Sequence, residues 1–223
     1  MYKKHGAFLM VLGFLLLTAA AGLTAYNIWD TNRAADSAEL ITQQLTIQIP
    51  ARKPAPMDTE LISLPSLETA PESMLMPEVE IPDYLLNPEM EMPVEIIDGV
   101  AYIGVLEIPD LGLSLPVATG WSYPLLRNSP CRCTGSAYQN NIVIAAHNYE
   151  RHFGNLRKLH IDSEISFTDM DGNVFVYRVT EFETLAPTAI ESMTSFERGL
   201  TLFTCTIGGR SRFALRAERT EIP

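Results

Sequence analysis

The stretch LTLFTCTIGGRSRFALRAE, from Leu200 to Glu218, predicts a β-hairpin near the end of the chain. Two β-rich runs flank a Gly-Gly pair at 208–209, which suits a tight two-residue turn because both glycines can take a positive φ. A hairpin centred on that pair places Cys205 opposite Arg212, with both side chains on one face of the sheet. Arg210 has the same parity as Arg212 but lies nearer the tip. The hairpin therefore predicts a thiol beside a guanidinium.

The sequence before this hairpin has the same β-rich character. From Ala101 onward, short apolar runs alternate with turn residues, which predicts about seven or eight short strands with brief helical insertions. The stretch HFGNLRKL is one such insertion, with Phe153, Leu156 and Leu159 on one side. We expect an all-β, barrel-like domain over residues 99–223. The strand stretches are AYIGVLEIP, LGLSLPVA, NNIVIAAH, EISFTD, NVFVYRVTEFETLA, LTLFTC and RFALRAE.

The N-terminal segment predicts a membrane anchor over residues 1–29. Gly6–Trp29 has no charged residue, and about 20 apolar residues suffice to span a bilayer as a helix. Lys3 and Lys4 precede it, so the positive-inside rule keeps the N-terminus in the cytoplasm and places the rest outside. The alternative is a signal peptide cleaved at the small residues 19–22, but the apolar run continues past them to an aromatic end.

Residues 30–98 predict an acidic, proline-rich linker between the anchor and the barrel. Residues 27–100 hold 14 Asp and Glu against 3 Lys and Arg, whereas residues 101–223 are nearly neutral. Nine prolines oppose long helices and interior strands, so we expect an extended tether. Two alternatives stay open: a helix that continues until Pro50, and local docking of the Leu- and Met-rich segment 74–92. If the tether is extended, a chain that begins near Ile97 is expected to keep its fold. No basic patch indicates a nucleic-acid partner.

The three cysteines make an odd number, which excludes a complete disulfide framework in an exported domain. Cys131 and Cys133 lie one residue apart in a stretch that resembles a loop. That spacing is poor for an unstrained disulfide, and one pair without a second is weak support for zinc. We interpret both as incidental and predict no metal and no cofactor. Cys205 is different, because it ends a strand opposite an arginine.

A reactive thiol also needs a proton partner, and His147 is the best candidate in the sequence. It ends the apolar run IVIAAH, where a buried strand meets the surface. His152 has polar neighbours and ranks second. A guanidinium beside a sulfur favours the thiolate and offers N–H donors to an oxyanion. Cys205, His147 and Arg212 are therefore the predicted catalytic residues.

These residues carry a resemblance to the sortase family. TLFTC, the downstream strand arginine and the upstream IVIAAHN are similar to the family's motifs in their order, and FGNLRKL and YIGVLEIPDLGLSLPV fit as well. The resemblance covers residues 100–218 and implies an eight-stranded β-barrel. It also implies a membrane-bound cysteine transpeptidase that cleaves an LPXTG-like sorting signal of surface proteins.

The same resemblance implies a role for each residue of the site. Cys205 is the expected nucleophile that forms a thioester, and His147 the proton donor and acceptor. Arg212 is expected to stabilise the oxyanion or hold the substrate, and Thr204 to help shape the substrate site. The implied acceptor is an amine of a peptidoglycan precursor or of a pilin.

Two other functions stay open from the residues alone. A cysteine peptidase of another fold needs only the Cys–His pair, although the β-rich pattern and the position of Arg212 argue against papain-like architecture. A catalytically silent β-domain that binds or displays a wall component would leave Cys205 unreactive. The sortase class is not assigned, because Ala146 stands where many members have glycine and TCTIGG lacks a proline found in some classes.

Overall fold

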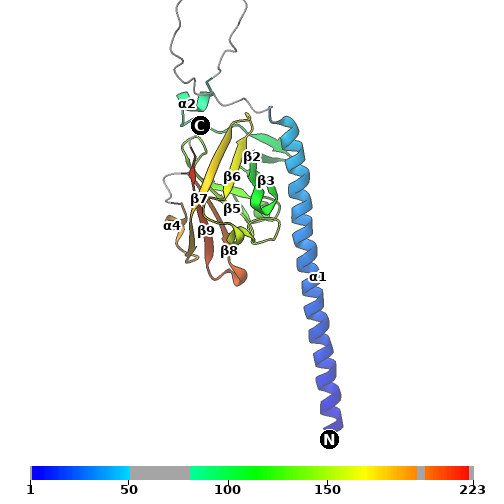
Figure 1. The fold of residues 1–223 in the computed structure, drawn as a ribbon. Helices are drawn as coiled ribbons and strands as arrows, with labels where there is room; N and C mark the ends of the chain where they lie inside the picture. The colour runs from blue at the N-terminus through cyan, green and yellow to red at the C-terminus, as the bar shows by residue number, and fades with distance from the viewer. Residues whose placement is uncertain (1, 51–80, 195–198, 221–223) are drawn as a thin grey trace, which may run out of the picture.

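A computed structural model describes residues 2–50, 81–194 and 199–220. Most of the predicted proline-rich tether, residues 51–80, lies outside this part of the chain. The described residues form one long helix, α1, and a β-barrel beside it (Figure 1).

Eight strands close into the barrel in the order β2-β3-β4-β5-β8-β9-β7-β6, and a further pairing of β6 with β2 completes the circle. Most neighbours are antiparallel, but β3–β4 and β5–β8 are parallel, so the barrel is mixed. The eight-stranded barrel expected from the sequence is therefore confirmed. Its strands are β2 (Val100–Ile108), β3 (Leu113–Ala118), β4 (Cys131–Thr134), β5 (Asn141–Ala145), β6 (Glu164–Asp169), β7 (Val174–Leu185), β8 (Gly199–Cys205) and β9 (Arg212–Arg219).

Short helical turns connect the strands on the outside of the barrel. The HFGNLRKL insertion contains the turn η2, and its Phe153, Leu156 and Leu159 are all buried in the barrel core, as their spacing predicts. The other short elements are α2 (Asp83–Leu86), α3 (Tyr123–Leu126), α4 (Ile190–Thr194), η1 (Pro109–Leu111), η2 (Leu156–Lys158) and η3 (Ile207–Gly209).

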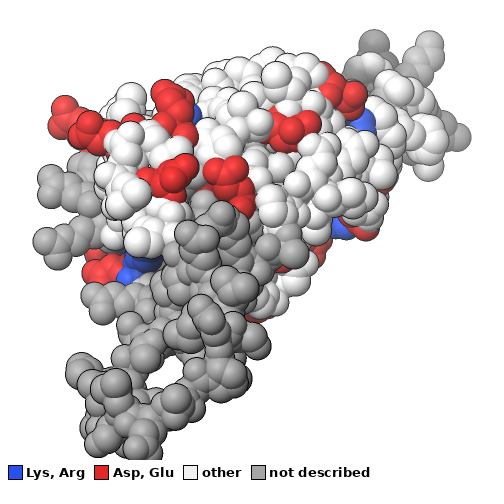
Figure 2. Space-filling model, turned by 90° about the horizontal axis from the view of Figure 1, so that it is seen from above, with Lys and Arg blue, Asp and Glu red and all other residues white. Residues whose placement is uncertain are grey.

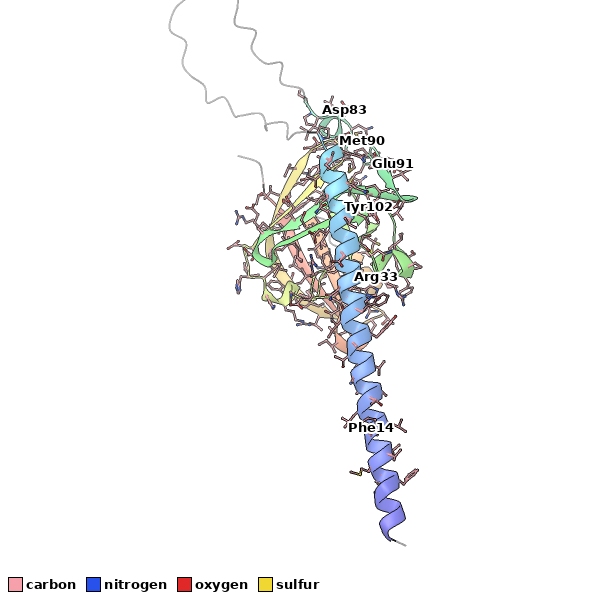
Figure 3. All side chains as sticks on the ribbon, turned by 90° about the vertical axis from the view of Figure 1, so that its right-hand side faces the viewer. Phe14, Arg33, Asp83, Met90, Glu91 and Tyr102 are labelled. Carbon is pink, nitrogen blue, oxygen red and sulfur yellow. The ribbon has the colours of Figure 1, made fainter. Side chains whose placement is uncertain are left out.

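Helix α1 runs without a break from Tyr2 to Gln48, so it continues well past the expected end of the anchor. Its second half lies along the barrel beside β3 and β2, and its first half extends beyond the barrel (Figures 1 and 3). Residues 30–48 therefore form a helix and not an extended linker, which confirms the alternative of a helix that continues until Pro50. The side chains that it buries recur with helical spacing. They are Ala34, Ala35, Ala38, Thr42 and Leu45.

The end of the predicted linker is also folded onto the barrel. Tyr84 and Met92 are buried within the main hydrophobic core, which confirms, for its described part, the alternative that segment 74–92 docks on the barrel. Strand β1 (Glu95–Ile97), which the sequence did not predict, pairs with the start of β2. Because these residues and α1 cover apolar side chains of the barrel, a chain that begins at Ile97 is now expected to lose stability rather than keep its fold.

A pair of substitutions on α1 measures this packing. Leu45 is fully buried against Tyr102 and Val105 of β2, whereas Leu40 of the same helix is exposed. We expect Leu45→Ala to lower the free energy of unfolding by about 2–5 kcal/mol, because it leaves a cavity in a packed interface. Leu40→Ala should change it by no more than about 0.5 kcal/mol. Denaturant unfolding of the full-length protein in detergent gives both values, and equal effects would contradict the packing of α1 on the barrel.

Candidate active site

Three neighbouring strands, β5, β8 and β9, bring the predicted catalytic residues to one edge of the barrel. β5 and β8 are parallel, with a constant offset of 58 residues from the pair Asn141–Gly199 to the pair Ala145–Phe203. Extrapolated two residues beyond the last pair, the same offset gives His147 and Cys205 equivalent positions on the two neighbouring segments. Adjacent strands lie about 4.8 Å apart, so the imidazole and the thiol start from neighbouring backbone positions.

The hairpin of β8 and β9 has the register that the sequence predicted, but its turn is not the expected two-residue turn: the 3-10 turn η3 spans Ile207–Gly209, and the N–H of Thr206 donates to the carbonyl of Ser211. Cys205 pairs with Arg212, and both glycines of the turn take a positive φ, 79° at Gly208 and 69° at Gly209. Nη1 of Arg212 donates hydrogen bonds of 3.2 Å to the carbonyls of Gly209 and Ser211. The guanidinium is thus held at the turn, next to the strand end that carries the thiol.

Thr204 links the strand of the cysteine to the strand of the histidine. Its side chain is buried, and its hydroxyl donates a 2.8 Å hydrogen bond to the carbonyl of Ala146, the residue before His147. The backbone N–H of Ala146 in turn donates to the carbonyl of Phe203. Beyond the last regular strand pair, these two bonds fix His147 relative to Cys205.

A cavity of about 340 Å³ opens beside the thiol. Cys205, Thr204 and Thr206 line one side of it, and the segment after β5 lines the other. The remaining lining residues are Asn148, Phe153, Gly154, Arg157, Ile207 and Phe213. The mixture of apolar walls and a few polar groups suits a short peptide segment.

His147 is half-buried, and its surroundings include a residue of α1. Its ring centroid lies 4.9 Å from that of Tyr149, and the Tyr149 hydroxyl donates a 2.7 Å hydrogen bond to Asp30 of α1. Burial lowers the pKa of His147, and the charge of Arg127 adds to this, while Asp30 opposes it. The neutral imidazole therefore predominates at neutral pH, as a proton acceptor requires.

The sequence does not indicate the Asp30–Tyr149 contact. The two residues are 119 positions apart, and Asp30 looked like the first residue of a linker. The hydrogen bond lowers the pKa of Asp30. Burial, and after it this hydrogen bond, raises the pKa of Tyr149 to about 12. The same hydrogen bond connects the end of the apolar helix segment directly to the loop of His147.

His152, the second candidate, is fully buried beneath Tyr149, with ring centroids 5.6 Å apart. Within the described residues, neither ring nitrogen has a hydrogen-bond partner. Burial lowers the pKa of His152 to about 4, with smaller contributions from the charges of His147 and Arg151. The residues that line the cavity next to Cys205 include neither His152 nor His147 nor Arg212.

This burial predicts a loss of stability in mild acid. Between pH 7 and pH 5 an unfolded histidine takes up a proton, but folded His152 does not. Lowering the pH therefore stabilises the unfolded state relative to the folded state. The folded pKa of about 4 corresponds to a loss of about 2 kcal/mol over this range. Denaturant unfolding of the full-length protein in detergent at both pH values tests this. In His152→Phe the pH-dependent loss should shrink by that amount, and an unchanged loss would contradict the prediction.

Cys131 and Cys133 lie in strand β4 and not in the loop that the sequence predicted, because Cys131 pairs with Ala145 of β5. Both are free thiols, and burial raises the pKa of Cys131 to about 12 and that of Cys133 to about 11. Among the described residues, no group of three His, Cys, Asp or Glu side chains could hold a metal ion.

The chain belongs to the sortase family, because residues 106–220 match the model of the sortase domain. Members of this family are cysteine transpeptidases, and the enzyme class expected from the sequence is confirmed. A search of curated proteins finds no significant match.

Solved sortase structures share this fold. A sortase D5 transpeptidase of Clostridium perfringens is 26% identical, with a TM-score of 0.50 over 57% of this chain and 83% of that one. Sortase C of Streptococcus pneumoniae is 25% identical, with a TM-score of 0.50 over 54% and 70%. Sortase C1 of Streptococcus agalactiae, at 23% identity, a TM-score of 0.50 and coverage of 57% and 72%, shares the fold.

Proposed function

We propose that this sortase cleaves an LPXTG-like sorting signal of surface proteins with Cys205 and transfers the protein to an amine. The observation that supports the proposal is the constant offset between β5 and β8, which gives His147 and Cys205 equivalent positions on neighbouring chain segments, with a cavity beside the thiol. Arg212 begins the next strand and supplies a cation at the same edge. The silent β-domain gains no support from this arrangement, since it needs no thiol beside an imidazole.

The proposed reaction has two halves with balanced proton transfers. The Cys205 sulfur attacks the carbonyl of the scissile Thr–Gly bond while its proton passes to His147, and Arg212 stabilises the oxyanion or holds the substrate. His147 then protonates the leaving amine, and a thioester remains. An incoming amine attacks the thioester, its proton passes to His147, and that proton returns to the released thiolate.

Thr204 is proposed to shape the substrate site rather than to react. Its methyl-bearing side chain borders the cavity, while its hydroxyl is already committed to the Ala146 carbonyl. The acceptor is proposed to be an amine of a peptidoglycan precursor or of a pilin. Water in place of an amine would make the enzyme a hydrolase.

A panel of sorting-signal peptides tests this function on the full-length enzyme in detergent. We expect cleavage after threonine, a covalent thioester adduct of Cys205 in mass spectrometry, and a transfer product when a pilin-like lysine peptide or an oligoglycine amine is added. Cleavage with no transfer to any amine would assign a hydrolytic peptidase. No adduct and no cleavage across the panel would refute the transpeptidase proposal.

We also propose that α1 anchors the enzyme in the cell membrane with a cytoplasmic N-terminus. Within α1, the described segment Phe8–Gln48 is long and apolar enough to cross a membrane as a helix. Lys3 and Lys4 at its start favour this orientation. Protease added to intact protoplasts should remove the barrel domain, and a protected domain would contradict the orientation.

A further inference from the structure

The catalytic edge lies at the end of the barrel that faces the apolar half of α1. In Figure 1 the turn between β8 and β9 is at the lower end of the barrel, toward the N-terminus, whereas α2 is at the opposite end. Figure 3 shows Arg33 alongside the lower part of the barrel and Phe14 well below it. Because Asp30 already contacts Tyr149 of the barrel, no flexible spacer separates the apolar segment from the catalytic domain.

The geometry of the helix sets the height of this end above a bilayer. From Gly6 to Trp29 a helix extends about 35 Å, slightly more than the roughly 30 Å of hydrocarbon in a bilayer. Tyr26 and Trp29, with ring centroids 6.0 Å apart, therefore fall in the interfacial region. Asp30 and the barrel end that it contacts must lie at the level of the lipid head groups.

This end of the barrel exposes large apolar and aromatic side chains. Trp121 and Tyr123 are 53% and 72% exposed and contact each other edge to face at 5.7 Å. Tyr123 lines a cavity of about 390 Å³ together with Arg33 of α1, and the guanidinium of Arg33 lies over the Trp29 ring. On the β8–β9 turn, Ile207 is 92% exposed. Amphipathic rings and isolated apolar tips are typical of side chains that enter a lipid interface.

The two ends of the domain differ in the charge of their exposed side chains. Arg127, beside Tyr123, and Arg210, beside the turn glycines, are exposed, and neither makes an ion pair with any residue that the structure describes. Among the charged side chains visible at the opposite end, carboxylates outnumber Lys and Arg (Figure 2). Asp83 and Asp171 line a cavity there. A chain with a net charge of −11 thus keeps unpaired arginines at the end nearest the apolar helix segment.

We propose that this end is a membrane-docking surface for anionic phospholipid, formed by Trp121, Tyr123, Arg127, Ile207 and Arg210. The proposal rests on the membrane anchoring proposed above. The rings and Ile207 enter the interface, and the arginines bind lipid phosphates, each contributing about 1 kcal/mol near an anionic surface. The acidic opposite end is repelled and points away. The thiol and its cavity then face the head-group layer, so a substrate or acceptor held in the membrane reaches Cys205 without leaving that layer.

Tryptophan fluorescence tests the docking, because the chain has only Trp29 and Trp121. Full-length protein is reconstituted in nanodiscs whose lipids carry a nitroxide quencher at the head group, with phosphatidylglycerol or with phosphatidylcholine alone. Trp29→Phe leaves Trp121 as the reporter, and Trp121→Phe leaves Trp29. The matched control combines both changes with Leu86→Trp, since Leu86 is 75% exposed on α2 at the far end.

We expect the fluorescence of Trp121 to be quenched nearly as strongly as that of Trp29. Quenching of Trp121 should be stronger in phosphatidylglycerol than in phosphatidylcholine, and the tryptophan of the Leu86→Trp variant should not be quenched. Arg127→Gln should lower the ratio of docked to undocked protein in phosphatidylglycerol about 5-fold, from about 1 kcal/mol per arginine. Arg178→Gln, which removes a charge paired with Glu164, should leave it unchanged.

The remaining outcomes contradict the proposal, and they distinguish a failure of docking, of the lipid preference and of the membrane anchor. Quenching of Trp29 without quenching of Trp121 would overturn docking and leave the anchor intact. Equal quenching of Trp121 in both lipids would overturn the preference for anionic phospholipid. Quenching of neither native tryptophan would refute the anchor, and docking with it. Cleavage of a soluble peptide in detergent is independent of all three outcomes.

Discussion

Cys205→Ala should abolish both cleavage of a sorting-signal peptide and transfer to an amine. Without the sulfur no thioester can form, and removal of a covalent nucleophile typically costs about 10⁶-fold in kcat. His147 and Arg212 remain in place but have no acyl-enzyme to act on. The measurement is peptide turnover by the full-length enzyme, with mass spectrometry to follow the adduct.

The other two cysteines provide matched controls for this loss. Cys133→Ser should change turnover little, because burial raises the pKa of that thiol to about 11 and it lies in β4, away from the cavity. Cys131→Ser is also expected to keep activity, although Cys131 is fully buried and the variant needs a check of its melting temperature. Substantial turnover by Cys205→Ala would end the transpeptidase proposal.

Arg212→Ala should slow turnover by roughly 100- to 1000-fold, the usual cost of one oxyanion donor. The register puts Arg212 opposite Cys205, and the two carbonyl bonds of its Nη1 keep the guanidinium close to the turn. Arg212→Lys should recover only part of the rate, because an ammonium keeps the charge but loses the planar donor fork.

Arg210→Ala separates this role from a general effect of positive charge. Arg210 lies beyond the last pair of the hairpin, on the exposed turn, so we expect a loss of no more than severalfold with a soluble peptide in detergent. A larger loss from Arg210→Ala than from Arg212→Ala would transfer the third catalytic role to Arg210. The roles proposed for Cys205 and His147 would stand.

The local part of the site was predictable because a hairpin is a local structure. Two glycines in sequence indicate a turn centred between them, and the centre of the turn sets which residues face each other across the strands, although the turn itself is longer than two residues and contains η3. The pair of Cys205 and Arg212 therefore follows from a few consecutive residues, and the structure has that register. The same holds for the η2 turn, whose three apolar side chains share one side and are buried together.

The position of His147 required more than local rules. Its place at the end of an apolar run indicated a strand end, but no pattern in the sequence predicts which strand lies beside β5. The parallel pairing with β8, at an offset of 58 residues, favours His147 over His152 as the proposed partner of Cys205. Such pairing depends on how the whole barrel closes, which is a property of tertiary structure.

The hairpin, the all-β domain and the apolar N-terminal helix were predictable from the amino-acid sequence, because each depends on neighbouring residues. The sequence left open whether the helix continues until Pro50, and its packing on the barrel shows that it extends to Gln48. Alanines make up much of its buried stripe, and alanine is a weak signal for burial since it occurs on any helix face. The contact of Asp30 with Tyr149 likewise exists only because folding brings residues 119 positions apart together. That contact, and not the sequence pattern, sets the catalytic edge next to the end of the apolar segment.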